Sequence, residues 1–449
     1  MKRNLLLIFT LQITFYLNAQ VINTSGLPDS SRITVENLFD MTLDELLSLK
    51  VENTDKSFSC YGFINTNLEQ VFQEPSINDE GKSIRKDGPL TWAPIRDFHI
   101  YGSQNVSNKI SVFFNLSRDE REGLEIRNAY GNFELKKYFQ IQVGKMYRSF
   151  GLYNSKLDQT PSFIGIEPPE LFDIDHLFLT RTTSFALHGE LPVGKNEISY
   201  FLSTENGEGG AKIGVVPLGW DLRYKSNTRS LIIGTSGYTS GGFVSPIHDI
   251  KNQKSYGGVL SWMEKDKFSV FGVFIEKKVG HLLIQSEYYV SPHNARRNTT
   301  QTLEIVNEAS ISEYQRNRFL DENYIKSNAT LTEADIIQDV SYVAQTWYIR
   351  LGYDISTHVG QFVPYLFFDY MSNPEIIQNQ NYGGDNEAGV SDNGVFYKPS
   401  LGVLYRPQQE VAIKLDASVH TQKVNGSLVS YPEIRLDFSF AFDVLKRIK

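Results

Sequence analysis

Oppositely charged residues recur close together in several segments in which apolar and polar residues alternate. Residues two or four positions apart point to the same face of an extended strand, so each pair lies on the polar face of its segment. Charges of both signs along one face can create a transverse field that orients passing solutes and sets selectivity. The same charges can equally form ion pairs that only hold a wall together, and both interpretations stay open. These candidate pore-lining residues are Asp221, Arg223, Arg350, Asp354, Lys414, Asp416, Arg435 and Asp437.

A second group of charges lies in the segment 149–180, a long connection between two predicted strands. Its acidic residues outnumber Lys156, and Pro161, Pro168 and Pro169 limit its flexibility. Folded inward, the segment would narrow a pore and place acids and aromatic rings in the path. Folded outward, it would be only a surface loop, and we expect the inward arrangement. The candidate constriction residues are Tyr153, Asp158, Glu167, Glu170, Asp173 and Asp175.

Signatures of enzyme chemistry are missing. The sequence has no HExxH, Gly-x-Ser-x-Gly or CxxC motif and no phosphate-binding glycine-rich loop, and its 8 histidines are scattered. It therefore predicts no enzyme, no cofactor and no metal site. A Ser, a His and an acid on neighbouring strands would escape such a search, because strand neighbours are distant in sequence. A barrel enzyme thus stays an alternative.

The elements that must position these charges are strands of about ten residues, the length that crosses a bilayer when tilted. From about Phe58 onward apolar and polar residues alternate, aromatic residues crowd the strand ends, and short connections alternate with long ones. A sheet in lipid must close, because an open edge leaves backbone groups without hydrogen bonds. The sequence therefore predicts an all-β fold, a transmembrane antiparallel β-barrel. The long loops are expected near 73–94, 149–180, 291–338 and 372–395.

The strand number is ambiguous from the pattern alone. We count about seventeen segments, whereas bacterial barrels of this kind have even numbers of strands. The two halves of the chain disagree about which side holds the short turns, and the mismatch lies between Arg229 and Val290. Sixteen strands are expected, with eighteen as the next alternative.

The start of the chain has the features of an exported protein. Residues 1–19 combine a positive start, an apolar run and a small-residue end, which is typical of a signal peptide. Residues 20–56 are expected to form a periplasmic leader with a short amphipathic helix at 42–50, packed on the barrel mouth or acting as a partial plug. The barrel would then comprise 57–449 and lie in the outer membrane.

Composition excludes several other classes of protein. Aromatic residues make up 13% of the chain, and the mean hydropathy is −0.30. No stretch after the signal peptide approaches the length of an apolar transmembrane helix, which excludes a helical membrane protein. A formal net charge of −8 without a basic stripe excludes nucleic acid as a partner. The single cysteine, Cys60, excludes internal disulfides.

Three short motifs carry a family resemblance. Ala129-Tyr130, then Ile141 to Met146, then Ser149 to Asn154 resemble the phosphate-selective porin (O and P type) family and porin-like outer-membrane β-barrel proteins. In those proteins a small–aromatic pair precedes a Val-Gly-Lys strand and a Phe-Gly-Leu turn. The run Phe201 to Gly207 is similar to a later element of such porins, and the resemblance is architectural after residue 240. It implies a sixteen-stranded barrel, often a homotrimer, with a loop folded into the pore.

The sequence departs from that family in its charges. The resemblance implies a ladder of basic pore residues for phosphate, but the sequence displays none and its candidate constriction is acidic, which favours cations. Our hypothesis is a porin, a water-filled channel in outer-membrane lipid for passive diffusion of small hydrophilic solutes or ions. The alternatives are a barrel scaffold or surface-binding protein that holds a partner with loops 291–338 and 372–395, and the barrel enzyme.

Overall fold

A computed structural model describes the barrel and most of its connections. The signal peptide predicted at 1–19, the leader at 20–56 and the helix at 42–50 lie outside the described residues. The described residues are 58–443 apart from 79, 81, 120–122, 170–179, 206–215, 227, 241, 245–257, 308–310, 326–329 and 377–390.

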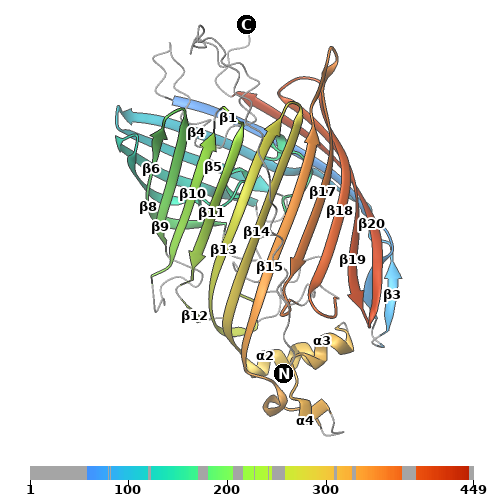
Figure 1. Ribbon diagram of the computed structural model, residues 1–449. Coiled ribbons are helices and arrows are strands. Elements are labelled where there is room, and N and C mark those ends of the chain that lie inside the picture. Colours follow the sequence, from blue (N-terminus) through green and yellow to red (C-terminus); the bar gives the residue numbers. More distant parts are fainter. Residues whose placement is uncertain are drawn as a thin grey trace, which may run out of the picture. The chain divides into compact units, whose positions relative to one another are not determined.

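The strands form one closed antiparallel sheet, because β1 pairs with β4 on one side and with β20 on the other (Figure 1). Backbone hydrogen bonds join 18 strand elements, but two pairs of these elements are single interrupted strands. β11 and β12 both pair with β13, and β15 and β16 both pair with β17, which leaves sixteen strands around the barrel. The prediction of sixteen is confirmed. The elements are β1 (Phe58–Val71), β4 (Thr91–Ser107), β5 (Ile110–Asp119), β6 (Gly123–Lys136), β7 (Phe139–Tyr147), β8 (Arg181–Val193), β9 (Asn196–Glu205), β10 (Leu218–Ser226), β11 (Leu231–Thr239), β12 (Phe243–Val244), β13 (Met263–Val279), β14 (Leu282–Arg297), β15 (Asp339–Tyr353), β16 (Ile355–Thr357), β17 (Gly360–Ser372), β18 (Val395–Arg406), β19 (Val411–Val424) and β20 (Ser427–Asp443).

The region where the strand count was ambiguous has a simple structure. β13 and β14 are long strands of 17 and 16 residues joined by the tight turn at Gly280 and His281. Gly280 has a φ of +60°, a conformation that glycine adopts without strain. β14 continues to Arg297, inside the connection predicted at 291–338, because its polar end still pairs with β13 and β15. Polar residues can extend a strand beyond the bilayer, so the apolar pattern ends before the strand does.

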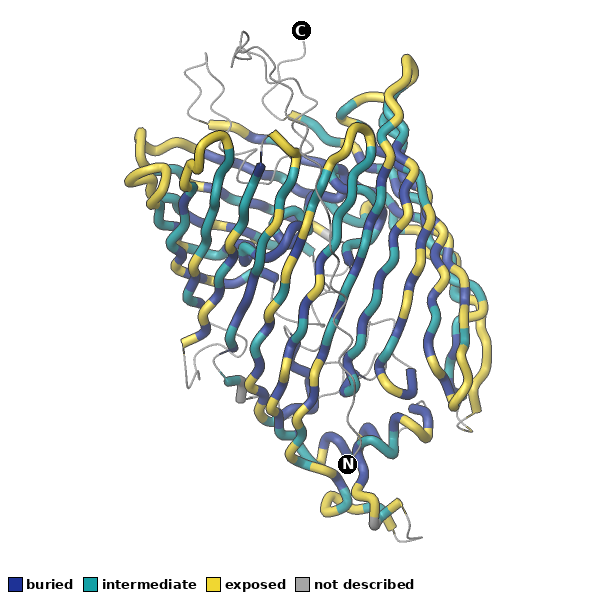
Figure 2. Tube along the Cα trace, in the orientation of Figure 1, coloured by how far each residue is buried: buried dark blue, intermediate teal, exposed yellow. Residues whose placement is uncertain are grey.

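Burial alternates along the strands of the barrel wall (Figure 2), and the two faces differ in polarity. Outward side chains such as Leu366, Leu401 and Ile434 are exposed apolar residues that a bilayer would cover. Inward side chains are buried and largely polar or charged. They include Asn65, Asn115, Ser184, Glu205, Asp221, Glu287, Arg350, Lys414 and Asp437. The wall thus places its ionic groups away from lipid.

Substituting Leu401 by Arg tests this assignment of faces. Leu401 lies near the middle of β18 and is 61% exposed. An arginine on the lipid face near the bilayer midplane costs about 2–4 kcal/mol of folding free energy, falling to about 1 or less near the interface. We expect Leu401→Arg to lower stability strongly and Leu428→Arg, beside the β19–β20 turn, to do so weakly. Equal stabilities in denaturant-dependent unfolding would contradict the assignment.

The connections at the two ends of the barrel differ in length. Tight turns such as 108–109, 137–138 and 358–359 lie at the end that holds the start of β1 and the finish of β20. The opposite end carries the β2–β3 hairpin (Glu74–Ile77 and Ser83–Lys86) and a helical connection between β14 and β15 (Figure 1). Its helices are α2 (Thr299–Asn307), α3 (Glu313–Asn317), α4 (Glu322–Ile325) and the 3-10 turn η5 (Glu333–Asp335). None of the helices in the described ranges is long and apolar enough to cross a membrane.

Candidate functional site

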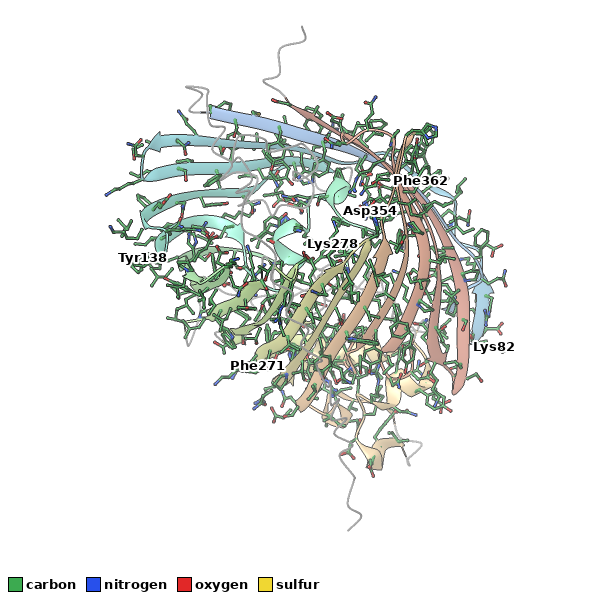
Figure 3. The ribbon with its side chains drawn as sticks, turned by 45° about the horizontal axis from the view of Figure 1, so that its top comes forward. Lys82, Tyr138, Phe271, Lys278, Asp354 and Phe362 are labelled. Atoms are coloured by element: carbon green, nitrogen blue, oxygen red, sulfur yellow. The ribbon has the colours of Figure 1, made fainter. Side chains whose placement is uncertain are left out.

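The described part of the predicted constriction, residues 149–169, lies inside the barrel and is called the inward segment from here on. It follows β7 and appears within the ring of strands in Figure 3. Its first part contacts the wall formed by β10, β11 and β14. The Arg223 Nη2 donates to the Gly151 carbonyl oxygen at 2.7 Å, and the Gly151 N–H donates to the Ser236 Oγ at 2.9 Å. The Phe150 ring packs against Tyr289, with ring centroids 4.6 Å apart.

The middle of the inward segment contacts a different part of the wall. The Asp158 carboxylate accepts a hydrogen bond from the Asn115 Nδ2 on β5 at 3.3 Å and lies 3.6 Å from the Arg181 guanidinium on β8. The Tyr101 hydroxyl on β4 donates to the Asp158 carbonyl oxygen at 3.5 Å. The inward segment therefore crosses from the wall formed by β10, β11 and β14 to the wall formed by β4, β5 and β8.

The last part of the inward segment reaches the wall formed by β15 and β18–β20. The Lys414 Nζ donates to the carbonyl oxygens of Thr160 and Gly165, the latter at 2.8 Å. Arg406 donates to the Pro161 carbonyl oxygen at 2.9 Å. Together with the earlier contacts, these bonds attach the inward segment to walls on several sides of the lumen.

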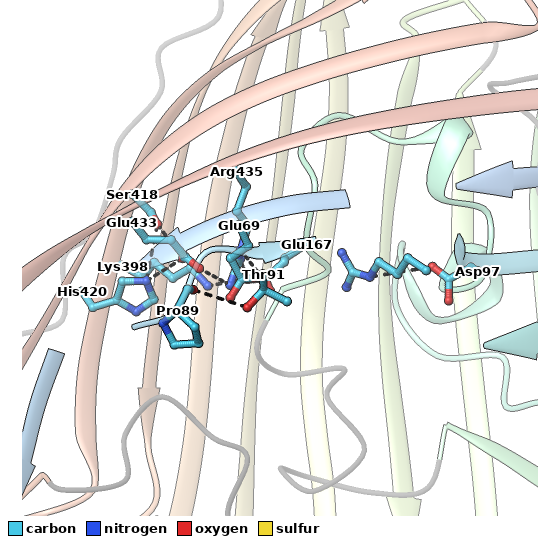
Figure 4. Close-up of polar contacts among 11 residues, drawn as sticks. Glu69, Pro89, Thr91, Asp97, Glu167, Lys398, Ser418, His420, Glu433 and Arg435 are labelled. Carbon is cyan, nitrogen blue, oxygen red and sulfur yellow. Dashed lines mark hydrogen bonds and ion pairs between the residues drawn. The ribbon is translucent and has the colours of Figure 1, made fainter. Parts of the chain in front are cut away.

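Glu167 ends this series of attachments in a charged cluster (Figure 4). Its carboxylate accepts a hydrogen bond from the Lys398 Nζ at 2.7 Å and forms an ion pair with Arg435. Arg435 also lies 2.6 Å from the carboxylate of Glu433, which in turn accepts a hydrogen bond from the His420 Nε2. The acid of the inward segment is therefore neutralised by cations of the wall.

Local sequence explains how the inward segment turns twice inside a barrel. Gly151 has a φ of +62°, and a Cβ there would overlap the Glu287 carboxylate, so only glycine fits. The 3-10 turns η2 (Asn154–Lys156) and η3 (Thr160–Ser162) shorten the path, the second with a proline near its start. The Asn154 Nδ2 donates to the carbonyl oxygens of Arg148 and Thr180, which closes the base of the loop.

Except for Asp354, the structure places the candidate pore-lining residues on the inner wall, but it pairs several of them differently from their spacing in sequence. Asp221 and Arg223 do pair along β10, with Oδ1 and Nε 2.5 Å apart. On β19 and β20 the partners lie across the strands, where Lys414 stands opposite Asp437 and Asp416 opposite Arg435. The Asp416 carboxylate accepts a hydrogen bond from the Tyr365 hydroxyl at 2.9 Å.

Arg350 and Asp354 are not brought together. Asp354 lies at the rim with the tight turns (Figure 3), where its carboxylate accepts a hydrogen bond from the Ser356 Oγ at 3.4 Å. Arg350 is 1% exposed, deeper in the barrel, and has no ion pair among the described residues. Of the constriction candidates, Tyr153, Asp158 and Glu167 belong to the inward segment. Glu170, Asp173 and Asp175 lie outside the described residues.

Sequence reasoning missed several buried groups of the lumen. The Arg148 Nη2 lies 2.5 Å from the Glu205 Oε2, and both side chains are 1% exposed. The Glu287 carboxylate accepts hydrogen bonds from the hydroxyls of Tyr348 at 2.6 Å and Tyr289 at 3.0 Å. Glu287 and Tyr289 lie two and four residues after Gln285 on β14, so the three side chains share one face of the strand. Gln285 stands opposite Arg350 on β15, and this shared polar face would have placed Glu287 and Tyr289 in the lumen.

A Ser, a His and an acid do meet on neighbouring strands. The Asp266 Oδ2 lies 2.9 Å from the His293 Nδ1, and the His293 Nε2 lies 3.0 Å from the Ser291 Oγ. These distances are those of a catalytic triad. Ser291 is 0% exposed, however, and the imidazole is stacked between Phe268 and Tyr342. A substrate carbonyl cannot reach the Ser291 hydroxyl in this conformation, and we interpret the trio as a polar network within the wall.

The attachment at Asp158 predicts a pH dependence. Burial alone would raise the pKa of Asp158, but the positive charges of Arg181 and its neighbours outweigh burial and lower this pKa to about 2. Because the folded pKa lies below the unfolded one, the ion pair stabilises the fold above about pH 4 and is lost as pH falls toward 2. Wild type should lose stability through this window and Asp158→Asn much less in pH-dependent unfolding. Parallel curves for both proteins would contradict the assignment.

Known proteins resemble this chain in fold. No protein-family model and no curated protein sequence matches the chain. Among solved structures, the outer membrane channel DcaP of Acinetobacter baumannii is similar with a TM-score of 0.52 and 12% identity, covering 86% of this chain and 97% of that one. An anion-selective porin from Comamonas acidovorans aligns with a TM-score of 0.49 and 10% identity, covering 86% of this chain and 99% of that one. The protein has the sixteen-stranded β-barrel fold of outer-membrane porins, as its likeness to DcaP shows.

Proposed function

We propose that this protein is a porin, through which small hydrophilic solutes diffuse passively across the outer membrane. The observation that carries the proposal is the inward segment, which crosses a polar lumen and is attached to β10–β11, β5–β8 and β18–β20. A segment held on several sides sets a fixed width for whatever passes beside it. The likeness to DcaP, described as an outer membrane channel, supports the same function.

The charges of the lumen support a different selectivity from the acidic constriction expected from sequence. Asp158 and Glu167 are each paired with cations of the wall, so their field is largely cancelled. Arg350 has no such anionic partner among the described residues. We therefore propose a channel that favours anions slightly rather than cations. A phosphate ladder gains no support here, because Lys398, Arg406 and Lys414 all bind other protein groups.

The test is conductance of the purified protein in a planar bilayer under a potassium chloride gradient. We expect stepwise openings and a reversal potential displaced toward the chloride equilibrium potential. A displacement toward potassium would restore the acidic constriction and contradict the proposed selectivity. Absence of openings from protein whose folded state is shown by heat-modifiable mobility would contradict the channel itself.

One observation favours the alternative of a barrel with partner-binding loops. Hydrogen bonds through Asp392 join the helical connection between β14 and β15 to loop 391–394 and to the β19–β20 turn. The Ser312 Oγ donates to the Asp392 carboxylate at 3.3 Å, and that carboxylate accepts hydrogen bonds from the N–H groups of Asn425 and Gly426. Loops that are held together by hydrogen bonds present a defined surface for a partner, and folded protein without conductance would favour this function.

The homotrimer implied by the family resemblance is also proposed, and light scattering of the protein in detergent measures the number of chains in the assembly.

A further inference from the structure

We propose that the outward face of β13, β14 and β15 binds the phosphate-bearing head group of an anionic lipid, at the end of the barrel that carries the long connections. The strands reach this end where β14 leads into the helical connection (Figure 1). The long loops of bacterial barrels are extracellular, so this part of the wall meets the outer leaflet of the membrane. The site lies on the outside of the barrel and is therefore independent of what passes through the lumen.

The outward side chains of these strands show where the bilayer ends. On β14 the stretch from Leu282 to Pro292 is about as long as the 9–11 residues that cross a bilayer when tilted. Along this stretch Phe271 and Val273 on β13 are exposed apolar residues, and Val343 on β15, opposite Pro292, is another. The outward residues of β14 that follow Pro292 therefore lie at the level of the lipid head groups.

Two rows of polar side chains lie beyond this level, toward the long connections. In the first row Lys267 stands opposite Asn294, and Asn294 stands opposite Ser341. In the second row Lys265 stands opposite Arg296. All of these side chains are exposed except that of Arg296, which is half-buried. Lys265 and Lys267 face the same side with their Cα atoms roughly 7 Å apart, so one phosphate group can contact both flexible ammonium groups.

Lys265 and Lys267 carry positive charge that the described wall does not neutralise. Neither ammonium group has an ion pair among the residues that the structure describes. Arg296 differs from them, because its guanidinium lies 3.6 Å from the Glu264 carboxylate. Asp339, the other acid of this surface, stands opposite Arg296 in the second row. The two lysines therefore leave a positive charge beside the head groups, where an anionic lipid can compensate it.

The position of the lysines favours a lipid phosphate over a free anion. An exposed ion pair in water contributes little, because both charges are hydrated and screened by salt. A head group, however, is held at this level by its own acyl chains, which lie against the apolar wall around Phe271 and Val273. Each lysine close to an anionic membrane surface strengthens binding by about fivefold. Two lysines are therefore enough to select anionic lipids from neutral ones.

Native mass spectrometry of the purified protein in a neutral detergent tests the site. The probes are dioctanoyl phosphatidic acid, whose head group is a phosphomonoester, and dioctanoyl phosphatidylcholine, whose head group has no net charge. We expect the wild-type protein to bind phosphatidic acid about tenfold or more tightly, because the acyl chains are identical and only the head groups differ. Equal affinities would overturn the proposal. Inorganic phosphate at the same concentration should leave the lipid bound, and displacement would assign the lysines to free anions instead.

Variants assign the preference to the two lysines. Replacing both Lys265 and Lys267 by Gln should weaken phosphatidic acid binding by about tenfold or more and leave phosphatidylcholine binding unchanged. Replacing both by Arg keeps the charge and should keep the preference. These side chains are exposed, so heat-modifiable mobility should show that the variants fold. A preference that survives in the double Gln variant would overturn the proposal.

Lys423→Gln is the matched control. Lys423 is also exposed and faces outward at the same end of the barrel, on β19, where it stands opposite the exposed Leu428. We expect this variant to prefer phosphatidic acid as strongly as the wild-type protein does. A loss equal to that of the double Gln variant would show a general effect of surface charge and would overturn the assignment to β13.

Discussion

Replacing Lys414 by Met is expected to release the end of the inward segment and to raise the single-channel conductance. Lys414 is 0% exposed, and its ammonium group donates to two carbonyl oxygens of the inward segment. It also lies 4.4 Å from the centroid of the Phe163 ring. A hydrogen bond from a charged group contributes about 1.5–3 kcal/mol, so losing two shifts the balance toward detached positions by about a hundredfold or more.

The measurement compares conductance and its fluctuations between wild type and variants in the same bilayer. Lys423→Met is a matched control, since Lys423 lies on the same strand with an exposed side chain. We expect Lys414→Met to show larger and noisier openings, Lys414→Arg to retain most of the wild-type behaviour, and Lys423→Met to match wild type. Identical conductance in Lys414→Met would show that other contacts suffice to hold the inward segment, or that it does not limit the current; either result would contradict its role as the anchor of the constriction.

The barrel could be predicted because its physical requirements repeat at every strand. Because each strand faces lipid on one side and a polar lumen on the other, apolar and polar residues must alternate with a period of two along every strand. The sheet must also close, because no strand edge can remain unpaired in lipid. The same period placed Asp221, Lys414 and Asp437 on the inner wall, where the structure has them. These properties depend on local sequence, so a single chain displays them.

Pairing within the lumen could not be predicted, because it depends on residues far apart in the chain. Arg435 meets Glu167, and Lys414 meets Thr160 and Gly165, across more than two hundred residues. The composition of the inward segment alone therefore does not give its net field, since the cations that pair with Asp158 and Glu167 come from distant parts of the chain.

Adjacent aromatic residues show the limit of composition as a guide. Tyr288 and Tyr289 are two of the aromatic residues that crowd the strand ends in the sequence, yet neighbours on a strand face opposite sides. In the structure Tyr288 is 41% exposed, whereas Tyr289 is 0% exposed and donates to Glu287 in the lumen. An aromatic pair at a strand end thus supplies one ring to the membrane side and one to the interior.

The ion pair between Arg148 and Glu205 predicts the largest loss of stability. It lies at the point where the chain leaves β7 for the inward segment. Its hydrogen bonds, from Nε to both carboxylate oxygens and from Nη2 to Oε2, are buried. The Thr182 and Ser203 hydroxyls donate to the remaining lone pairs of the carboxylate. The Arg148 guanidinium also lies 3.6 Å above the Tyr238 ring. Removing either charge leaves the other buried without its counter-ion.

Arg148→Met is therefore expected to lower the free energy of unfolding by about 3–5 kcal/mol, as breaking a buried pair does. Glu205→Gln should cost a similar amount, because it leaves the guanidinium charged. The double variant should cost much less than the sum, since no buried charge is left unpaired, and guanidinium-dependent unfolding in detergent measures all three. Strictly additive losses would mean that the two side chains stabilise the wall separately, through Tyr238 and through Thr182 and Ser203. Strong coupling would instead show that the base of the inward segment is held by the pair itself, and a channel of fixed width requires such a hold.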